Sequence, residues 1–242
     1  MKRILKVNPR IIAYDMHPDY LSTKYAKEVS AYDIKIPVQH HHAHVASCMA
    51  ENGLKKKVIG LAWDGTGYGE DGCVWGGEFL IADFCSFERK AFFSYLPMPG
   101  GEKAIKEPYR MAISYLYQTF GDNFMDLALP FLSQMDDEKL SAILETLKKG
   151  INSPLTSSAG RLFESISSIL GVRNKNTFEG QAAIELEYLA SSTRKRNDIS
   201  VYPYVINQIA SQYQIDVTPM IKQIVKESVN QNLRQELLLP FM

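Results

Sequence analysis

Residues 57–84 read "KVIGLAWDGTGYGEDGCVWGGEFLIADF", and their pattern gives the clearest indication of the fold class. Residues 58–63 form an apolar run with β-branched and aromatic side chains, and residues 74–84 form a second one, so two strands are expected. Residues 64–72 between them are rich in glycine and acidic side chains, which is typical of a turn-rich loop. The stretch therefore predicts a β-hairpin with a glycine-dense tip.

The segment before the hairpin has the pattern of a strand, a helix and a second strand. Residues 10–18 indicate a short buried strand that ends in a turn, and residues 34–38 indicate another strand. Between them, residues 22–33 have helical spacing, with Ser22 as the expected N-cap. A further helix of about three turns is expected to begin in a histidine cluster and to stop at Gly53. This order, followed by a hairpin, indicates an α/β domain.

From about Lys106 onward, apolar residues recur at the helical period. The period extends through most of the remaining chain, so the second half is expected to be mainly helical. We place a fold boundary near residue 100. Residues 1–100 would form an α/β subdomain that carries the motifs described below, and residues 101–242 a mainly helical region.

Charge and length limit the classes of function. Lys and Arg together number 27, as do Asp and Glu, so the formal net charge of the 242 residues is zero. That balance gives no electrostatic reason to expect nucleic acid or an anionic membrane as a partner. The longest apolar runs are too short to span a bilayer, and no signal-peptide pattern follows the basic N-terminus. Cys48, Cys73 and Cys85 are widely spaced and are expected to be reduced thiols in a cytoplasmic protein.

Four of the five histidines fall within residues 40–44, which read "HHHAH". On a helix, His40 and His44 lie on one face, with the spacing of a two-imidazole metal clamp. His41 and His42 would then orient these rings or a substrate. A structural or surface cluster is the alternative, because this spacing also recurs by chance. We favour a metal site, for Zn or Fe.

Asp64 stands where the first strand of the hairpin meets the glycine-rich segment. A carboxylate there can hold a metal or position a phosphate. Six glycines lie between residues 65 and 77, and their missing side chains would let backbone amides approach an anion. A tight hairpin tip is the alternative. The glycines outnumber what one hairpin needs, so phosphate binding is favoured.

Two later segments could also contact an anionic or hydroxyl-rich ligand. Lys103, Lys106 and Arg110 bring positive charge to a turn rich in proline and glycine, where they could meet phosphate or form a solvated helix face. Residues 156–158 offer N-cap oxygens to the following helix, in which Glu164 could accept ribose hydroxyls. An ordinary capped helix is the alternative for this segment.

In this order, six segments resemble the HypF family of carbamoyltransferases, which act in nickel–iron hydrogenase maturation. The resemblance is to the C-terminal domain of the family, which is similar to TsaD-like proteins and O-carbamoyltransferases. Among the segments are "PVQHHHAHVASCMAENGL" and "GLAWDGTGYGEDGCVWGGEFL", and together they lie at residues 15–26, 37–54, 60–80, 96–112, 157–172 and 178–187. The resemblance implies an actin-like fold of the ASKHA class, the sugar kinase and heat-shock ATPase class. In that fold, nucleotide and metal bind in a cleft between two α/β halves.

The resemblance also implies a reaction. Family members make carbamoyl-adenylate from carbamoyl phosphate and ATP in an upstream domain. The domain resembled here then passes the carbamoyl group to the C-terminal cysteine of HypE, a partner that can be joined by HypC. A divalent metal would serve as the Lewis acid, and the glycine loop would stabilise the leaving phosphate. Because the nucleophile is a thiol of the partner, this chain would need no catalytic Cys or Ser.

Each implied site residue matches a motif position of the family. His40, His44 and Asp64 match the metal ligands and are the implied catalytic residues. The implied nucleotide contacts are Gly65, Thr66, Gly67, Gly160, Glu164 and Gly180. Glu164 stands where relatives commonly have Asp, and its extra methylene leaves the ribose contact open.

The chain also departs from the family pattern. Relatives are much longer, and their upstream domains, their later SGGV-type motif and their Asn-Asp-Gly-Gly segment with another metal-binding Asp do not occur in this sequence. After Ser191 we expect only helix. These departures predict half of a nucleotide cleft, lowered metal affinity and a chain that is inactive alone. A metal-stabilised scaffold that docks HypE, alone or with HypC, is the competing prediction, and a sugar kinase-like enzyme is a third.

Overall fold

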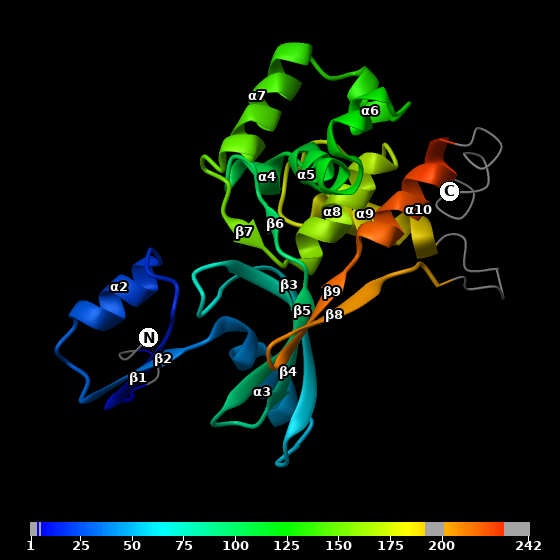
Figure 1. Ribbon diagram of the computed structural model, residues 1–242. Coiled ribbons are helices and arrows are strands. Elements are labelled where there is room, and N and C mark those ends of the chain that lie inside the picture. Colours follow the sequence, from blue (N-terminus) through cyan, green and yellow to red (C-terminus); the bar gives the residue numbers. More distant parts are fainter. Residues whose placement is uncertain (1–3, 5, 192–200, 230–242) are drawn as a thin grey trace.

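The computed structural model describes residue 4, residues 6–191 and residues 201–229. These residues form a small N-terminal unit and a larger unit, in which helices gather at one end of a mixed sheet (Figure 1). Both units combine helices with strands, so the predicted α/β class is confirmed.

The N-terminal unit consists of two parallel strands joined by a helix. β1 (Ile11–Asp15) pairs with β2 (Ile34–Val38), and α2 (Leu21–Glu28) connects them. In Figure 1 this unit lies to one side of the remaining chain. Both predicted strands are confirmed, but the first is not buried as predicted, since the Ile11 side chain is exposed.

The predicted N-cap of the connecting helix was wrong. The helix begins at Leu21, one residue before Ser22, and the cap position at Tyr20 makes no side-chain bond. The Thr23 hydroxyl instead donates to the carbonyl oxygen of Asp15 at 2.7 Å. This bond fixes the first turn of the helix to the end of β1, which makes a serine cap unnecessary.

α3 (His40–Glu51) carries the histidine cluster, as the sequence predicts. The side chain of Gln39 caps the helix by accepting the backbone amide of His42 at 2.9 Å. Gly53 follows the end of the helix with a φ of 64°, which confirms the predicted stop. Apolar packing holds α3 on the sheet through one cluster that comprises Val45, Met49, Ala62, Leu80 and Ala82.

The larger unit contains a seven-stranded sheet. β3 (Val58–Tyr68), β4 (Val74–Ala82) and β5 (Phe87–Phe93) form an antiparallel meander, which confirms the predicted hairpin. The prediction that residues 64–72 form its loop was wrong. β3 extends to Tyr68, its pairing with β4 shifts register between Trp63 and Gly67, and the turn is confined to residues 69–73.

The remaining strands come from the second half of the chain. They are the short strands β6 (Leu96–Pro97) and β7 (Leu155–Thr156) and the hairpin of β8 (Val205–Ile209) and β9 (Gln212–Asp216). Because β9 pairs in parallel with β5, the prediction that only helix follows Ser191 was wrong. Polar and apolar side chains alternate over residues 212–216, which is the strand pattern. Strands from both sides of residue 100 share one sheet, and the division there into two domains stays a prediction.

Helices otherwise dominate the second half, as the sequence predicts. They are α4 (Lys103–Lys106), α5 (Tyr109–Phe120), a 3-10 helix (Gly121–Asp126), α6 (Pro130–Ser133), α7 (Asp137–Lys149), α8 (Ala159–Ile169), α9 (Gln181–Ser191) and α10 (Thr218–Val229). The main hydrophobic core lies among them and includes Ile113, Leu116, Ile169 and Ile221. The predicted continuation of the last helix beyond Val229 lies outside the described residues. No helix in the described part of the chain is long and apolar enough to cross a lipid bilayer.

Candidate metal centre

The structure brings His40, His44 and Asp64 together where the start of α3 faces β3. The two histidines project from one face of α3, and their Nε2 atoms lie 3.1 Å apart. Asp64 Oδ2 lies 3.0 Å from His40 Nε2 and 3.7 Å from His44 Nε2. Helical spacing and the position of Asp64 in β3 thus produce a compact cluster of three ligand atoms.

These separations fit one shared metal ion. Ligand atoms held about 2.0–2.1 Å from a tetrahedral zinc ion lie about 3.3 Å from one another. Two imidazoles and one carboxylate also leave a coordination position open, as in catalytic zinc sites and in iron sites with two histidines and a carboxylate. The three residues therefore fit the predicted divalent metal, and the choice between Zn and Fe stays open.

The charges at this cluster depend on how tightly the groups pack. The hydrogen bond to Asp64 outweighs burial and, together with a bond to Asp15, raises the pKa of His40 to about 9. Burial opposes the ionisation of Asp64, but hydrogen bonds from His40 and from the Gly65 amide hold the pKa of that carboxyl below its usual range. At neutral pH the metal-free centre therefore holds a proton on His40 beside an ionised Asp64.

His41 and His42 have structural environments. His41 is fully buried, and this burial lowers the pKa of its imidazole to about 4, so the ring is neutral. Its Nδ1 lies 3.2 Å from the side-chain nitrogen of Gln39. His42 Nε2 donates to the carbonyl oxygen of Asp83 at 2.7 Å, which ties α3 to the turn after β4. The predicted role of these rings in orienting a substrate stays a prediction.

Close packing against the imidazoles explains one glycine of the "DGTGYG" segment. A Cβ atom on Gly67 would lie 2.3 Å from His41 Cε1 and 2.9 Å from His40 Cδ2. Any side chain at this position would therefore displace the rings that form the centre. Close packing therefore explains why glycine stands at position 67, without any need for a bound phosphate. The predicted contact of Gly67 with nucleotide stays a prediction.

The neighbouring backbone packs tightly against the start of α8. A Cβ atom on Gly160 would lie 2.8 Å from the Cα atom of Gly65. The Ser158 side chain caps α8 and lies 2.8 Å from the carbonyl oxygens of both Asp64 and Gly65. The structure therefore brings the backbones of Gly160 and Gly65 together, and their predicted contacts with nucleotide stay predictions. Thr66 lies next to them, half-buried on β3.

Glu164 is not placed as an open acceptor for ribose. Its side chain is fully buried, and Oε2 lies 2.8 Å from Arg161 Nε. Oε1 accepts Arg161 Nη2 at 2.9 Å and Asn176 Nδ2 at 3.2 Å. Burial outweighs the attraction of Arg161 and raises the pKa of Glu164 to about 7. A ribose hydroxyl would have to replace one of these partners. Gly180, the last of the predicted nucleotide contacts, lies just before α9 with a φ of 74°.

A buried charged cluster fixes the hairpin beside the centre, and no sequence pattern predicted it. The Arg89 guanidinium donates to Glu78 Oε2 at 2.5 Å and to the Tyr95 hydroxyl at 2.8 Å, and it lies 3.9 Å from the ring centroid of Trp75. Trp75 Nε1 donates to Asp71 Oδ1 at 2.8 Å, which holds the turn of the hairpin. Because the Trp75 ring centroid also lies 6.1 Å from that of His41, the cluster lies next to this imidazole.

Asp15 is the residue near the ligands that sequence reasoning missed. Its Oδ2 accepts His40 Nδ1 at 2.7 Å, on the opposite side of the ring from Asp64. The signal was present, because β1 ends at Asp15 and the parallel strand β2 ends two residues before His40. The carboxyl ends of neighbouring parallel strands meet at one edge of a sheet, where ligand-binding residues gather.

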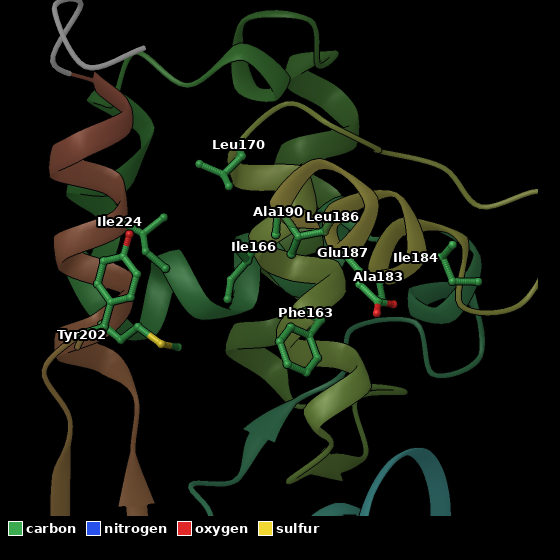
Figure 2. A pocket seen from close by; sticks show the side chains of 11 residues that line it. Phe163, Ile166, Leu170, Ala183, Ile184, Leu186, Glu187, Ala190, Tyr202 and Ile224 are labelled. Atoms are coloured by element: carbon green, nitrogen blue, oxygen red, sulfur yellow. The ribbon is translucent and has the colours of Figure 1, made fainter. Parts of the chain in front are cut away.

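Two further features lie apart from the three ligands. The Arg110 guanidinium donates to Glu107 Oε2 at 2.5 Å, so part of the positive charge at residues 103–110 is neutralised within the chain. A cavity of about 590 Å³ opens between α8, α9 and α10. Figure 2 shows that apolar side chains such as Phe163, Ile166 and Ile224 line it, which does not suit a phosphate.

Comparisons with known proteins agree on one family. The model described as "Carbamoyltransferase, Kae1-like Domain, second subdomain" matches residues 60–242, and the model described as "HypF Kae1-like domain" matches residues 1–51. The carbamoyltransferase HypF of Synechocystis sp. is 38% identical over 240 residues, which cover 94% of this chain and 31% of that protein. HypF of Rhodobacter capsulatus is 40% identical over 192 residues, which cover 76% of this chain and 25% of that protein.

Solved structures give the same result. The crystal structure of full-length HypF in the phosphate- and nucleotide-bound form matches with a TM-score of 0.87 and 42% identity, over 99% of this chain and 30% of that one. The structure of T. kodakarensis HypF matches with a TM-score of 0.78 and 33% identity, over 93% of this chain and 30% of that one. The chain thus spans about a third or less of these relatives.

Substitution of Gly67 tests whether close packing builds the centre. Gly67→Ala is expected to push on the His41 and His40 rings, to lower the free energy of unfolding by roughly 1–3 kcal/mol and to weaken Zn²⁺ binding. Gly65→Ala is the matched control, because its Cβ atom would meet only Arg161 Nη2, at 3.6 Å. Chemical denaturation and chelator competition measure the two effects. Equal stability and equal metal affinity of both variants would contradict the packing argument.

The raised pKa of His40 predicts that metal binding releases protons. An ion needs the unprotonated Nε2, whereas the metal-free centre keeps His40 protonated up to about pH 9. The apparent affinity for Zn²⁺ should therefore rise with pH between 6 and 8, by about tenfold per unit for each proton released. Calorimetry in buffers of different ionisation enthalpy counts these protons. His42→Gln should still release them, and a proton count of zero at pH 7 for the unsubstituted chain would show that His40 is not a ligand.

Proposed function

The chain belongs to the HypF carbamoyltransferase family, and we propose from this that it supplies the metal-binding part of a carbamoyl-transfer site. One observation carries the proposal: the ligand atoms of His40, His44 and Asp64 lie close enough to one another to bind a single metal ion. The fold would be part of an actin-like domain of the ASKHA class, in which a nucleotide binds beside the metal. The free thiols of Cys48, Cys73 and Cys85 support a cytoplasmic location.

The proposed reaction transfers a carbamoyl group to sulfur. Carbamoyl phosphate and ATP would first be converted to carbamoyl-adenylate by another part of a HypF protein. The thiol of the C-terminal cysteine of HypE, alone or with HypC, would then attack the carbamoyl carbon. A C–S bond forms, the bond between that carbon and the adenylate oxygen breaks, AMP leaves with the bonding electrons, and the thiol proton is lost.

The chain's own residues would hold and orient the reacting groups. His40, His44 and Asp64 would bind a divalent ion, Zn or Fe, which when bound supplies a Lewis acid for the carbonyl and phosphate oxygens. The negative charge of Asp64 and the neutral imidazoles would fix its position. The backbone of Gly65, Thr66 and Gly67, next to Asp64, would lie beside the leaving phosphate.

A second function is favoured by the state of Glu164. Because Arg161 and Asn176 engage its carboxylate, the ribose contact expected from the family is occupied by groups of the chain itself. A metal-stabilised scaffold that docks HypE or its complex with HypC needs no such contact. It would bind the same ion through the same three ligands and would perform no chemistry.

Nucleotide binding separates the two functions. We expect the metal-loaded chain to bind ATP or AMP, and Asp64→Asn to lose that binding, because the metal and the adjoining backbone would both be disturbed. Asp122→Asn is the matched control, since Asp122 is exposed and pairs only with Lys148 in the contacts described. Calorimetric titration with each nucleotide measures the effect. Metal binding without any nucleotide response would support the scaffold and reject the transfer site.

Transfer itself requires a separate assay. Because the chain spans about a third of its relatives, we expect it to leave HypE unmodified when incubated alone with carbamoyl phosphate, ATP and HypE. Mass spectrometry of HypE detects the carbamoyl group. Robust modification by this chain alone would show that it holds a whole carbamoylating enzyme.

A further inference from the structure

We propose that Asp15 is a positioning residue of the metal centre, whose carboxylate holds the proton of His40 on Nδ1 and so turns Nε2 toward the ion. The inference rests on the proposed metal site and goes beyond its three ligands. It assigns a function to the segment "DMHP" at residues 15–18, which resembles the family but contains none of the implied site residues.

The geometry at His40 carries the inference. Nδ1 donates to Asp15 Oδ2 at 2.7 Å, while Nε2 lies 3.0 Å from Asp64 Oδ2 and 3.1 Å from His44 Nε2. A neutral imidazole has one N–H group and one lone pair. When Nδ1 carries the proton, the lone pair of Nε2 points into the cluster of ligands. A carboxylate behind the ring also raises the basicity of the ligating nitrogen.

Asp15 is itself held firmly, as a positioning group must be. Its other carboxylate oxygen, Oδ1, accepts the backbone amide of His17 at 2.8 Å. Its carbonyl oxygen accepts the Thr23 hydroxyl at 2.7 Å, and Thr23 is fully buried. Pairing of Asp15 with Val38 places it at the carboxyl end of the parallel strands. Val38 ends β2, and His40 begins α3 two residues later.

Asp15 does not act as a fourth ligand. Its oxygen approaches Nδ1, and the imidazole ring of His40 lies between it and the point where the three ligand atoms converge. The group of described residues whose donor atoms could share an ion comprises His40, His44 and Asp64 alone. Asp15 therefore acts on the ion through His40.

The bond also joins the N-terminal unit to the centre. In the described part of the chain, both hydrophobic core clusters consist of residues beyond residue 44, so neither cluster includes this unit. Besides the bond to His40, the His17 ring meets the Tyr68 ring at 5.4 Å. A metal ion that fixes His40 would thereby also fix Asp15 and the end of β1.

Substitution of Asp15 tests the inference through metal affinity. Asp15→Ala is expected to weaken Zn²⁺ and Co²⁺ binding by about 10–100-fold, because His40 loses the acceptor that holds its tautomer. Asp15→Asn should recover part of this loss, since an amide oxygen still accepts Nδ1–H but carries no charge. Asp19→Asn is the matched control, because Asp19 lies in the same loop with its side chain 80% exposed. Competition with a chelator measures all four proteins.

Two spectroscopic measurements separate positioning from a loss of folding. The visible spectrum of bound Co²⁺ should change in Asp15→Ala, because the His40 ring can turn, and should stay unchanged in Asp19→Asn. In the Zn²⁺-loaded chain without substitutions, long-range ¹H–¹⁵N spectra should show His40 protonated at Nδ1, a result that needs no variant to fold.

The outcomes are distinct. Wild-type affinity and spectrum in Asp15→Ala, or a proton on Nε2 of His40 in the loaded chain, would overturn the role of Asp15 and leave the metal centre intact. Failure of the chain without substitutions to bind either ion would overturn the proposed metal centre, and the role of Asp15 with it.

Discussion

Two imidazoles from the start of α3 meet one carboxylate from β3, and the rest of the site is built around this contact. His40 Nε2 lies 3.0 Å from Asp64 and 3.1 Å from His44, so basic nitrogens meet each other and a carboxylate at the same point. Such crowding is costly unless a proton or a metal ion is shared between the groups. In the metal-free chain, His40 carries this proton at neutral pH because its pKa is raised. The three ligand side chains are then already in place for an ion.

The surrounding structure serves to keep these donors close. α3 is held on the sheet by Val45 and Met49, and the absence of a side chain at Gly67 lets β3 lie directly against the imidazoles. Behind the rings, Trp75 is fixed by Asp71 and by the Arg89–Glu78 ion pair. A buried ion pair contributes little net stability compared with apolar packing, but breaking it by removing one partner costs about 3–5 kcal/mol. Such a pair therefore holds one arrangement of the hairpin.

Much of this site could be predicted from the sequence because its signals are local. Helical spacing put His40 and His44 on one face, and Asp64 followed a clear apolar strand. What could not be predicted depended on contacts between distant segments. Because glycine is usual in turns, the sequence did not indicate that β3 extends through residues 64–68. This extension is seen only in the structure, where Gly67 packs against His41. The burial of Glu164 depends on its contacts with Asn176 and Arg161. The β8–β9 hairpin depends on the pairing of β9 with β5. Asp15 was missed because its place beside His40 depends on the parallel pairing of β1 with β2, which no local pattern indicates.

X-ray absorption spectroscopy of the zinc-loaded chain tests whether His40, His44 and Asp64 hold the ion, since it reports the atoms bound to the metal. We expect two imidazole nitrogens at about 2.0 Å together with oxygen donors, and weaker imidazole scattering in His44→Ala, where His40 alone remains. A first shell that contains sulfur at about 2.3 Å, or one with no imidazole, would contradict this expectation. In that case the ion would be held by cysteine or by surface groups, and the convergence of His40, His44 and Asp64 would have another cause.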